Sequence, residues 1–323
     1  LTACAESDWS PEMKLSQLSA ADLRERLRSS GIWLRTGPFS LRVQSRVESV
    51  AKGLTDLYGQ FEVRNSHETF ADFHVAVNPP SRVRSWLRPQ VNFSFDGVEP
   101  FKPLPLDQAY PMLEWGLNWC ITSQAHHYLI IHAAVVEKNG RAAILPAPPG
   151  SGKSTLTAGL VLSGWRLLSD ELTLIDRKTG LIHALPRPVS LKNESIPLIR
   201  AFSPEAFINR ASHDTAKGTV AHMRPPKASV RRQHEPACPR WIIFPKWVAD
   251  GETELVPRSK QQTFQTLTQQ AFNFDRLGAE GLRVCNGLIK RADCFDFQYS
   301  RMEEAVAVFN RLADSASADA SGT

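Results

Sequence analysis

Hydrophobic and polar positions in the first 125 residues predict one short helix followed by strands. Apolar residues recur at helical spacing from Leu15 to Leu27, where Ser19 precedes the first turn as an N-cap. Apolar and polar residues then alternate in three segments, the last two of which run into turn residues, and this predicts strands at 39–43, 73–77 and 91–95. We therefore expect a small α+β domain with an antiparallel sheet over residues 1–125, disordered at residues 1–12.

After a proline-rich segment, the pattern changes to strands and helices arranged around a glycine-rich loop. The predicted elements around the loop are, in order, a helix at 111–123, strands at 128–136 and 141–146, a helix at 155–163 and a strand at 165–169. Those beyond it are a strand at 241–244, a helix at 261–272, a strand at 294–299 and a helix at 302–313. This succession predicts an α/β core with a mixed, twisted sheet over residues 126–313, before a disordered Ala/Ser-rich tail at 314–323.

Composition and charge argue against a nucleic-acid-binding protein and against a membrane-spanning one. The chain has 323 residues, of which 42% are hydrophobic, so each of two domains can bury a core. Its 38 basic residues are set against 33 acidic ones and are spread along the chain, so no nucleic-acid partner is expected. The denser basic segments at 82–88 and 224–232 are interpreted as solvated loops, and only second as docking surfaces. No apolar stretch approaches the roughly 20 residues that span a membrane, and five cysteines without a CxxC pair indicate reduced thiols in a cytoplasmic protein.

The strongest chemical signal is the segment Ala-Pro-Pro-Gly-Ser-Gly-Lys-Ser-Thr at 147–155, between an apolar strand and a helix. It matches the phosphate-binding pattern GxxxxGK(S/T) except that Ala147 occupies the first glycine position. Glycines let backbone N–H groups point at phosphate oxygens, and the following helix adds the positive end of its dipole. Lys153 is expected to reach the β- and γ-phosphates of ATP, and Ser154 to hold Mg²⁺. The predicted nucleotide-binding residues are Pro149, Gly150, Ser151, Gly152, Lys153, Ser154 and Thr155.

Three further residues have side chains suited to phosphoryl transfer. Asp170 and Glu171 follow the strand at 165–169, where a carboxylate beside a phosphate-binding loop can hold Mg²⁺ or take a proton from a hydroxyl. A turn or helix-capping pair explains them equally well. His132 lies in the apolar run before the loop, and a lone histidine on such a strand is more often a core residue than a catalyst.

These residues resemble the HPr kinase/phosphorylase family, bacterial enzymes that phosphorylate a serine on a small carrier protein. The family pattern has a His-small residue pair before the loop and a G-(H/W/Y)-x-L-x-x-D-D segment after its helix. Here the corresponding residues are His132-Ala133 and Gly164-Trp165-Arg166-Leu167-Leu168-Ser169-Asp170-Glu171. The resemblance covers roughly residues 132–191 and implies a P-loop kinase core of the HPr kinase/PEP carboxykinase-like type. It also implies that Asp170 deprotonates the acceptor hydroxyl, that His132 tunes the protonation of Asp170, and that Glu171 lies near the metal.

The segment after the carboxylates departs from that family. Its glycine-rich signature is missing, so the chain resembles a divergent relative rather than the sugar-regulation enzyme itself. Arg187 and Lys192 could clamp phosphates and Glu194 could complete the Mg²⁺ shell, although an exposed charged loop explains them equally well. Arg224 is a weaker candidate of the same kind, since an arginine on a late loop can stabilise a transferring phosphoryl group.

The sequence as a whole therefore predicts an ATP- and Mg²⁺-dependent kinase with Asp170 as general base, Lys153 and His132 beside it, and metal ligands among Ser154, Asp170, Glu171 and Glu194. The expected acceptor is a hydroxyl, foremost a serine of a protein or peptide. Alternatives are a small-molecule kinase, a nucleotide-dependent ATPase or switch, and an ATP-binding scaffold without turnover. No membrane partner is expected, and the resemblance implies a homo-oligomer.

Overall fold

The computed structural model describes residues 13–64, 70–80 and 89–321, with side chains described up to residue 316. The chain divides into two compact units, Leu1–Gly116 and Leu117–Thr323. The division falls inside helix α4 (Ala109–Gln124), whereas the sequence placed it at the end of that helix. The expected disorder at residues 1–12 and the basic segment at 82–88 lie outside the described residues. No helix in the described part of the chain combines the length and apolar character needed to cross a membrane.

The first unit is built on a seven-stranded sheet, with helices α1 (Ala20–Arg28) and α2 (Glu48–Tyr58). The strand order is β1 (Met13–Lys14), β4 (Glu62–Arg64), β2 (Ile32–Thr36), β3 (Phe39–Ser45), β5 (Phe73–Asn78), β6 (Gln90–Phe95) and β7 (Leu104–Pro105). The Ser19 side chain caps α1, as predicted, by accepting a hydrogen bond from the Asp22 N–H at 3.1 Å.

The prediction of an antiparallel sheet in this unit is wrong, because β3 and β5 pair in parallel. A parallel pair requires a crossover connection, and here the chain passes through α2 and β4 between the two strands. The alternating pattern revealed the strands but hid α2, whose Val50, Leu54 and Leu57 are buried at helical spacing.

The second unit contains a mixed eight-stranded sheet, as the sequence predicted for this part of the chain. The order is β12 (Ile182–His183), β11 (Leu172–Asp176), β8 (Tyr128–Lys138), β9 (Arg141–Pro146), β16 (Cys238–Trp247), β18 (Asp293–Tyr299) and β17 (Glu254–Pro257), with β10 (Arg166–Ser169) also paired to β8. Strands β8 and β9, which correspond to the strands predicted at 128–136 and 141–146, form a hairpin, and Asn139 and Gly140 supply the positive φ angles of its turn. Strand β16 is parallel to both β9 and β18.

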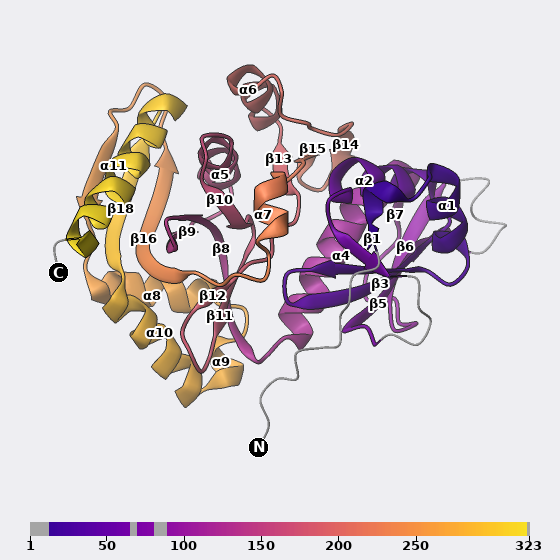
Figure 1. The fold of residues 1–323 in the computed structure, drawn as a ribbon, viewed down its shortest axis with the longest axis horizontal. Coiled ribbons are helices and arrows are strands. Elements are labelled where there is room, and N and C mark those ends of the chain that lie inside the picture. Colours follow the sequence, from indigo (N-terminus) through magenta and orange to yellow (C-terminus); the bar gives the residue numbers. More distant parts are fainter. Residues whose placement is uncertain (1–12, 65–69, 81–88, 322–323) are drawn as a thin grey trace. The chain divides into compact units, whose positions relative to one another are not determined.

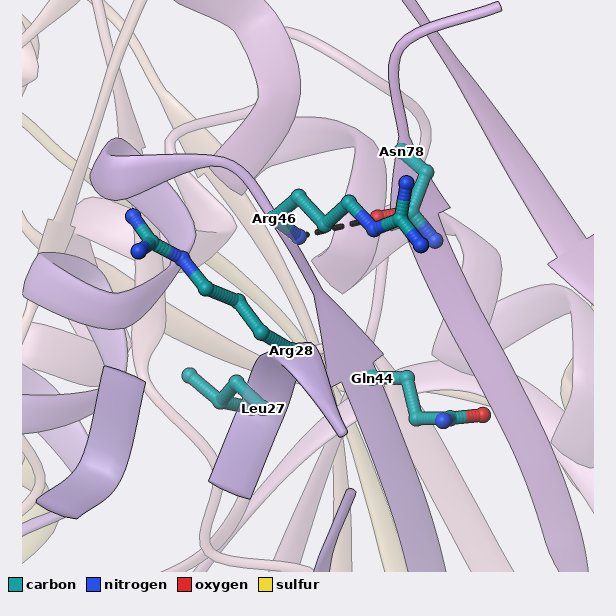
Figure 2. Close-up of a pocket in the computed structure, with 5 residues that line it drawn as sticks. All are labelled: Leu27, Arg28, Gln44, Arg46 and Asn78. Carbon is teal, nitrogen blue, oxygen red and sulfur yellow. Dashed lines mark hydrogen bonds between the residues drawn. The ribbon is translucent and has the colours of Figure 1, made fainter. Parts of the chain in front are cut away.

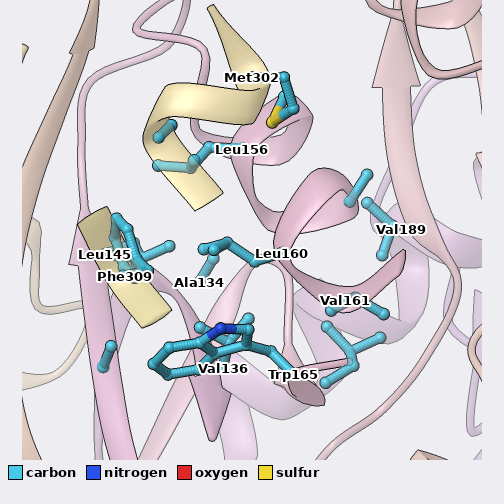
Figure 3. Packing of buried hydrophobic residues seen from close by; sticks show 14 of the residues in the cluster. Ala134, Val136, Leu145, Leu156, Leu160, Val161, Trp165, Val189, Met302 and Phe309 are labelled. Atoms are coloured by element: carbon cyan, nitrogen blue, oxygen red, sulfur yellow. The ribbon is translucent and has the colours of Figure 1, made fainter. Parts of the chain in front are cut away.

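Side chains of β8 point alternately to the two faces of the sheet, and each face packs into a different hydrophobic core. Ala134 and Val136 pack with α5 (Lys153–Leu162) and α11 (Met302–Ser321), as Figure 3 shows for their neighbours Leu156, Trp165 and Phe309. Residues on the opposite face, such as Ile131 and Val135, pack with α8 (Lys260–Gln270) and α10 (Ala279–Arg291). The sheet is therefore covered by helices on both faces (Figure 1).

The predicted disordered tail is wrong for most of its length, because α11 continues to Ser321. Ala313 and Ala316 are buried in the same core as Phe309. The Ala/Ser-rich composition suggested disorder, but alanine is the best helix former and its small side chain allows close packing against a neighbour.

A three-stranded sheet, β13 (Val189–Lys192), β15 (Gly218–Met223) and β14 (Ser212–Thr215), lies beside α5. Val189 and Leu191 pack against the α5 core together with Ile196 and Ile199 of α6 (Ser195–Phe202). The reading of 187–194 as an exposed charged loop is therefore wrong for β13 and for the buried Arg187. In the basic segment at 224–232, residues Lys227–Arg231 form helix α7 rather than a loop.

Candidate functional site

The glycine-rich loop links β9 to α5 and is fixed at its end by two residues from distant strands. Gly152 caps the helix in a left-handed conformation, with φ of +85°, and Gly150 has φ of +86°. The Ser151 carbonyl accepts a hydrogen bond from the Trp247 N–H at 2.9 Å, and the Gly152 carbonyl accepts one from the Tyr299 hydroxyl at 3.0 Å. Burial raises the pKa of Tyr299, so its hydroxyl remains a donor.

The two glycines give a matched test of this loop. A Cβ atom at Gly152 would lie 2.6 Å from the Tyr299 hydroxyl and 3.0 Å from the Trp247 Cβ, whereas one at Gly150 meets nothing within 4 Å. We expect Gly150→Ala to cost about 1 kcal/mol of unfolding free energy, for the left-handed backbone alone. Gly152→Ala should cost roughly 2–4 kcal/mol, because steric overlap adds to the same strain. Denaturant unfolding of both variants measures the difference, and equal losses would contradict the Tyr299 contact.

Lys153 is the first residue of α5 and is only 8% exposed. Its Nζ atom is buried and has no hydrogen-bond partner among the described residues. Burial lowers the pKa of Lys153, and the carboxylates of Asp170 and Glu171 partly offset this effect. A buried ammonium group with unused donors is costly, and an anion is the group that satisfies it.

Asp170 follows β10 and is 5% exposed. Its Oδ2 atom accepts a hydrogen bond from the Ser190 N–H at 3.1 Å, while Oδ1 is buried without a partner of hydrogen-bond geometry in the described structure. Burial raises the pKa of Asp170 to about 6, against the opposing influence of Lys153 and the Ser154 hydroxyl. The carboxylate is thus charged at neutral pH and protonated not far below it, which suits a general base.

Glu171 is half-buried and is held by a chain of two hydrogen bonds. Its Oε2 atom accepts from Asn118 Nδ2 at 3.3 Å, and Asn118 Oδ1 accepts from Arg187 Nη2 at 2.8 Å. Burial alone would raise the pKa of Glu171, but the surrounding positive charges, Lys153 foremost, lower it. Arg187 therefore lies close to the carboxylates, although through Asn118 rather than by direct contact with Glu171.

His132 lies on β8 opposite Leu172 of β11, one position after Glu171, and its ring centroid is 5.9 Å from that of Phe272. Burial, followed by the charge of Lys153, lowers its pKa to about 4. The structure thus places His132 beside Glu171, but the imidazole is neutral near neutral pH. The implied role of His132 in tuning the protonation of Asp170 stays a prediction, and a neutral ring would exert it through its polarity rather than through a net charge.

The remaining predicted residues divide into two groups. Lys192, at the end of β13, contributes to the electrostatic environment of Lys153, His132 and Glu171. Glu194 is exposed at the start of α6, and Arg224 is exposed with its guanidinium 4.1 Å from the ring centre of Phe207. Neither is among the charges that most affect Lys153, Asp170 or Glu171, so their predicted roles in Mg²⁺ and phosphate binding gain no support.

The arrangement fits Mg²⁺ bound together with a phosphorylated ligand. In the described part of the chain, no group of three or more His, Cys, Asp or Glu side chains is arranged to hold a metal by itself. Mg²⁺ ordinarily takes one or two protein carboxylates and fills its other positions with phosphate oxygens and water. Ser154, Asp170 and Glu171 could hold such an ion, and the buried Oδ1 of Asp170 is the atom most in need of a cationic partner.

The first unit contains a pocket of about 310 Å³ lined by Leu27, Arg28, Gln44, Arg46 and Asn78 (Figure 2). The guanidinium groups of Arg28 and Arg46 extend in opposite directions in this view. Asn78 accepts a hydrogen bond from the Arg46 N–H, and Gln44 donates one to the Ser29 carbonyl. Without donors that converge on one point, this pocket is a weaker candidate than the loop and its carboxylates.

Sequence reasoning missed the residues that come from distant elements. Asn118, Ser190, Trp247 and Tyr299 touch the site but belong to no local motif. Lys217, in the turn between β14 and β15, also lowers the pKa of Glu171 and was not anticipated. The sequence did contain a signal for Trp247 and Tyr299, because Trp247 lies shortly after the strand predicted at 241–244 and Tyr299 ends the strand predicted at 294–299. That signal did not indicate which loop the two residues contact.

Comparison with known families gave one finding, and it overlaps this site. A family model described as SynChlorMet cassette protein ScmC matches residues 112–192. The matched segment contains the glycine-rich loop, α5, both carboxylates and β13, and makes up about a quarter of the chain. A search of curated proteins gave no significant match.

Proposed function

We propose that this protein is an ATP-dependent kinase with a P-loop core of the HPr kinase-like type. The observation that carries the proposal is a pair of buried, unpartnered atoms of opposite charge, Lys153 Nζ and Asp170 Oδ1, in the described structure. They come from the start of α5 and the end of β10, next to a loop with two left-handed glycines. The Lys153 ammonium requires an anion, and the Asp170 carboxylate requires a cation or a hydrogen-bond donor. The Mg²⁺ complex of a nucleotide, together with a hydroxyl acceptor, would supply both.

Each residue then has a task in the proposed reaction, and Asp170 has two. The amides at the start of α5 and the Lys153 ammonium bind the phosphates. Ser154 and Glu171, with Asp170, would hold Mg²⁺, which when bound neutralises negative charge on the phosphates. Asp170 accepts the proton of the acceptor hydroxyl, and its Oδ2 is oriented by the Ser190 N–H. Arg187 and Asn118 keep Glu171 in place through their two hydrogen bonds.

The direct test separates nucleotide binding from phosphoryl transfer. Titration with a fluorescent ATP analogue and Mg²⁺ should give saturable binding that ATP displaces. Incubation with γ-labelled ATP and a panel of hydroxyl compounds and serine peptides should move label to an acceptor. Absence of binding would remove the P-loop assignment. Binding with phosphate release to water alone, unaffected by any acceptor, would favour an ATPase or switch.

The activity should depend on pH through Asp170. A general base works only when deprotonated, and burial places the pKa of this carboxyl at about 6. We therefore expect kcat/KM to be level from about pH 7 to 8 and to fall about tenfold per pH unit well below pH 6. A profile measured from pH 4.5 to 8 checks this, with ATP binding followed in parallel. An acid limb centred near pH 4 would point to a solvated carboxylate instead.

Stability should change with pH in the opposite direction. The folded pKa of Asp170 is about 6 and the unfolded value about 3.8, so the folded state binds the proton more tightly. The carboxyl thus contributes less to stability as the pH rises from about 4 to 6, by an amount of order 3 kcal/mol. Because other groups titrate in the same range, the measurement is the difference in unfolding free energy between the parent protein and Asp170→Asn. That difference should shift in favour of the variant as pH rises, and a constant difference would contradict the raised pKa.

A further inference from the structure

Ser190 is a buried polar residue of the site to which no catalytic task has been given. Its backbone N–H donates to Asp170 Oδ2 at 3.1 Å, which places β13 directly beside the proposed base. The side chain is only 7% exposed, and its Oγ atom has no hydrogen-bond partner among the described residues. A buried hydroxyl in this state destabilises the fold, so stability alone does not account for a serine here.

The register of the small sheet shows which side chains share a face with Ser190. Val189 and Leu191 of β13, and Ala221 and Met223 of β15, belong to the hydrophobic core around α5. Side chains alternate along a strand, so Ser190 and Lys192 lie on the opposite face. His222 lies on that face as well, because it is the direct cross-strand partner of Ser190. The face turned away from that core therefore carries a hydroxyl, an imidazole and an ammonium group, next to the buried Val220, which is the cross-strand partner of Lys192.

Positive charge surrounds the same region. Lys192 and Lys217 both lower the pKa of Glu171 and of His132. Lys217 lies in the turn that joins β14 to β15, so it projects from the same three-stranded sheet as Ser190. Its own pKa is lowered by burial and by Lys192, while Glu171 opposes that change. The sheet thus combines buried hydrogen-bonding groups near Asp170 with two ammonium groups.

We propose that the face of β13 and β15 carrying Ser190, Lys192 and His222 is the subsite for the phosphoryl acceptor. The acceptor it fits is a hydroxyl compound with a nearby carboxylate. Ser190 Oγ hydrogen-bonds the acceptor beside Asp170, and Lys192 and Lys217 pair with the carboxylate. The proposal rests on the kinase function proposed above. In the transfer, the acceptor oxygen forms the new bond to the γ-phosphorus, the bond to the β–γ bridging oxygen breaks, ADP leaves, and the hydroxyl proton passes to Asp170.

The test uses probes that differ only in charge. One pair is L-serine and L-serinamide, and the other is a peptide with serine flanked by aspartates and its counterpart with asparagines. We expect label from γ-labelled ATP to reach the carboxylate member of at least one pair with kcat/KM about five- to tenfold higher than its neutral counterpart. The pair that responds tells whether the acceptor is a free hydroxy acid or an acidic peptide.

Variants test whether the preference for carboxylate-bearing probes depends on residues of the three-stranded sheet. Lys217→Gln should remove the preference while leaving the affinity for the ATP analogue within about twofold. Lys178→Gln, an exposed lysine in the turn between β11 and β12, should retain it. Ser190→Ala should lower transfer to both members of the responding pair by about tenfold, as expected for loss of one hydrogen bond to the acceptor.

Four outcomes would overturn the proposal. These are equal transfer to charged and neutral probes, an unchanged preference in Lys217→Gln, full transfer by Ser190→Ala, and tight ATP binding with no transfer to any probe. Mass spectrometry of the protein after incubation adds a fifth, since phosphate on Ser190 itself would make it an acceptor rather than a ligand. Failure of the kinase proposal is distinguishable, because the parent protein would then either not bind the ATP analogue or transfer label to none of the hydroxyl compounds in the wider panel, whereas failure of the acceptor subsite alone leaves transfer to other members of that panel.

Discussion

Asp170→Asn should reduce phosphoryl transfer by about 10²- to 10⁴-fold, the usual contribution of a general base. Affinity for the ATP analogue should change only modestly, because we propose that Lys153 and the loop amides, rather than Asp170, bind the phosphates. Asparagine keeps an oxygen that can accept from the Ser190 N–H, so the local hydrogen bond survives. The measurement is single-turnover transfer at saturating ATP, together with nucleotide titration of the same preparation.

Two controls separate chemistry from folding. Asp275→Asn changes an exposed carboxylate on α9 (Phe274–Leu277) and should transfer at the parent rate. Thermal unfolding at pH 7.5 should find Asp170→Asn at least as stable as the parent, because a charge that burial disfavours has been removed. If the variant transfers phosphate at the parent rate, Asp170 is not the base and the scaffold or ATPase alternative becomes the better explanation.

Lys153→Met should weaken binding of the ATP analogue by about 100-fold or more, since the only buried ammonium at the start of α5 is lost. Methionine has a similar length and no charge, so the fold should persist. The same substitution removes the charge that most lowers the pKa of Asp170. The pH-dependent stability difference attributed to Asp170 should therefore extend above pH 6 in this variant.

Lys178→Met serves as the matched control, because this lysine is exposed in the turn between β11 and β12. It should bind the analogue as the parent protein does. Unchanged affinity in a folded Lys153→Met variant would contradict phosphate binding at the loop. A shift in affinity without any change in the pH-dependent stability would instead mean that Lys153 and Asp170 are not electrostatically coupled.

Much of the site could be predicted because its chemistry is concentrated in short segments. The glycine-rich loop and the Asp170-Glu171 pair lie within one strand–helix–strand succession, where turn geometry and apolar spacing are local properties. The structure brings Lys153, Asp170 and Glu171 close enough for their charges to interact, with His132 beside Glu171. Asn118 and Ser190 were missed since each reaches the carboxylates through tertiary packing, which leaves no signal at a fixed spacing in the sequence.

The fold was predictable to a similar degree. The strands and helices that were predicted lie within a few residues of observed ones, apart from the end of α11, because hydrophobic periodicity indicates which face is buried. About half of the elements, among them β2, α2, β11 and α10, were not predicted. Pairing direction was not, because it depends on how the chain crosses over, as α2 does between β3 and β5. Composition also misled at the C-terminus, where the alanine-rich part of α11 packs onto the core through Ala313 and Ala316.

The two hydrogen bonds that fix the glycine-rich loop bear on how quickly and tightly a ligand can bind. Trp247 and Tyr299 hold the Ser151 and Gly152 carbonyls through hydrogen bonds within the protein, so the fold itself orders the backbone there. A flexible loop loses roughly 1–2 kcal/mol of conformational entropy per residue when it is ordered by a ligand. Here that loss would be part of folding rather than of binding, so we expect Tyr299, a residue of the last strand, to influence ligand affinity through the loop backbone.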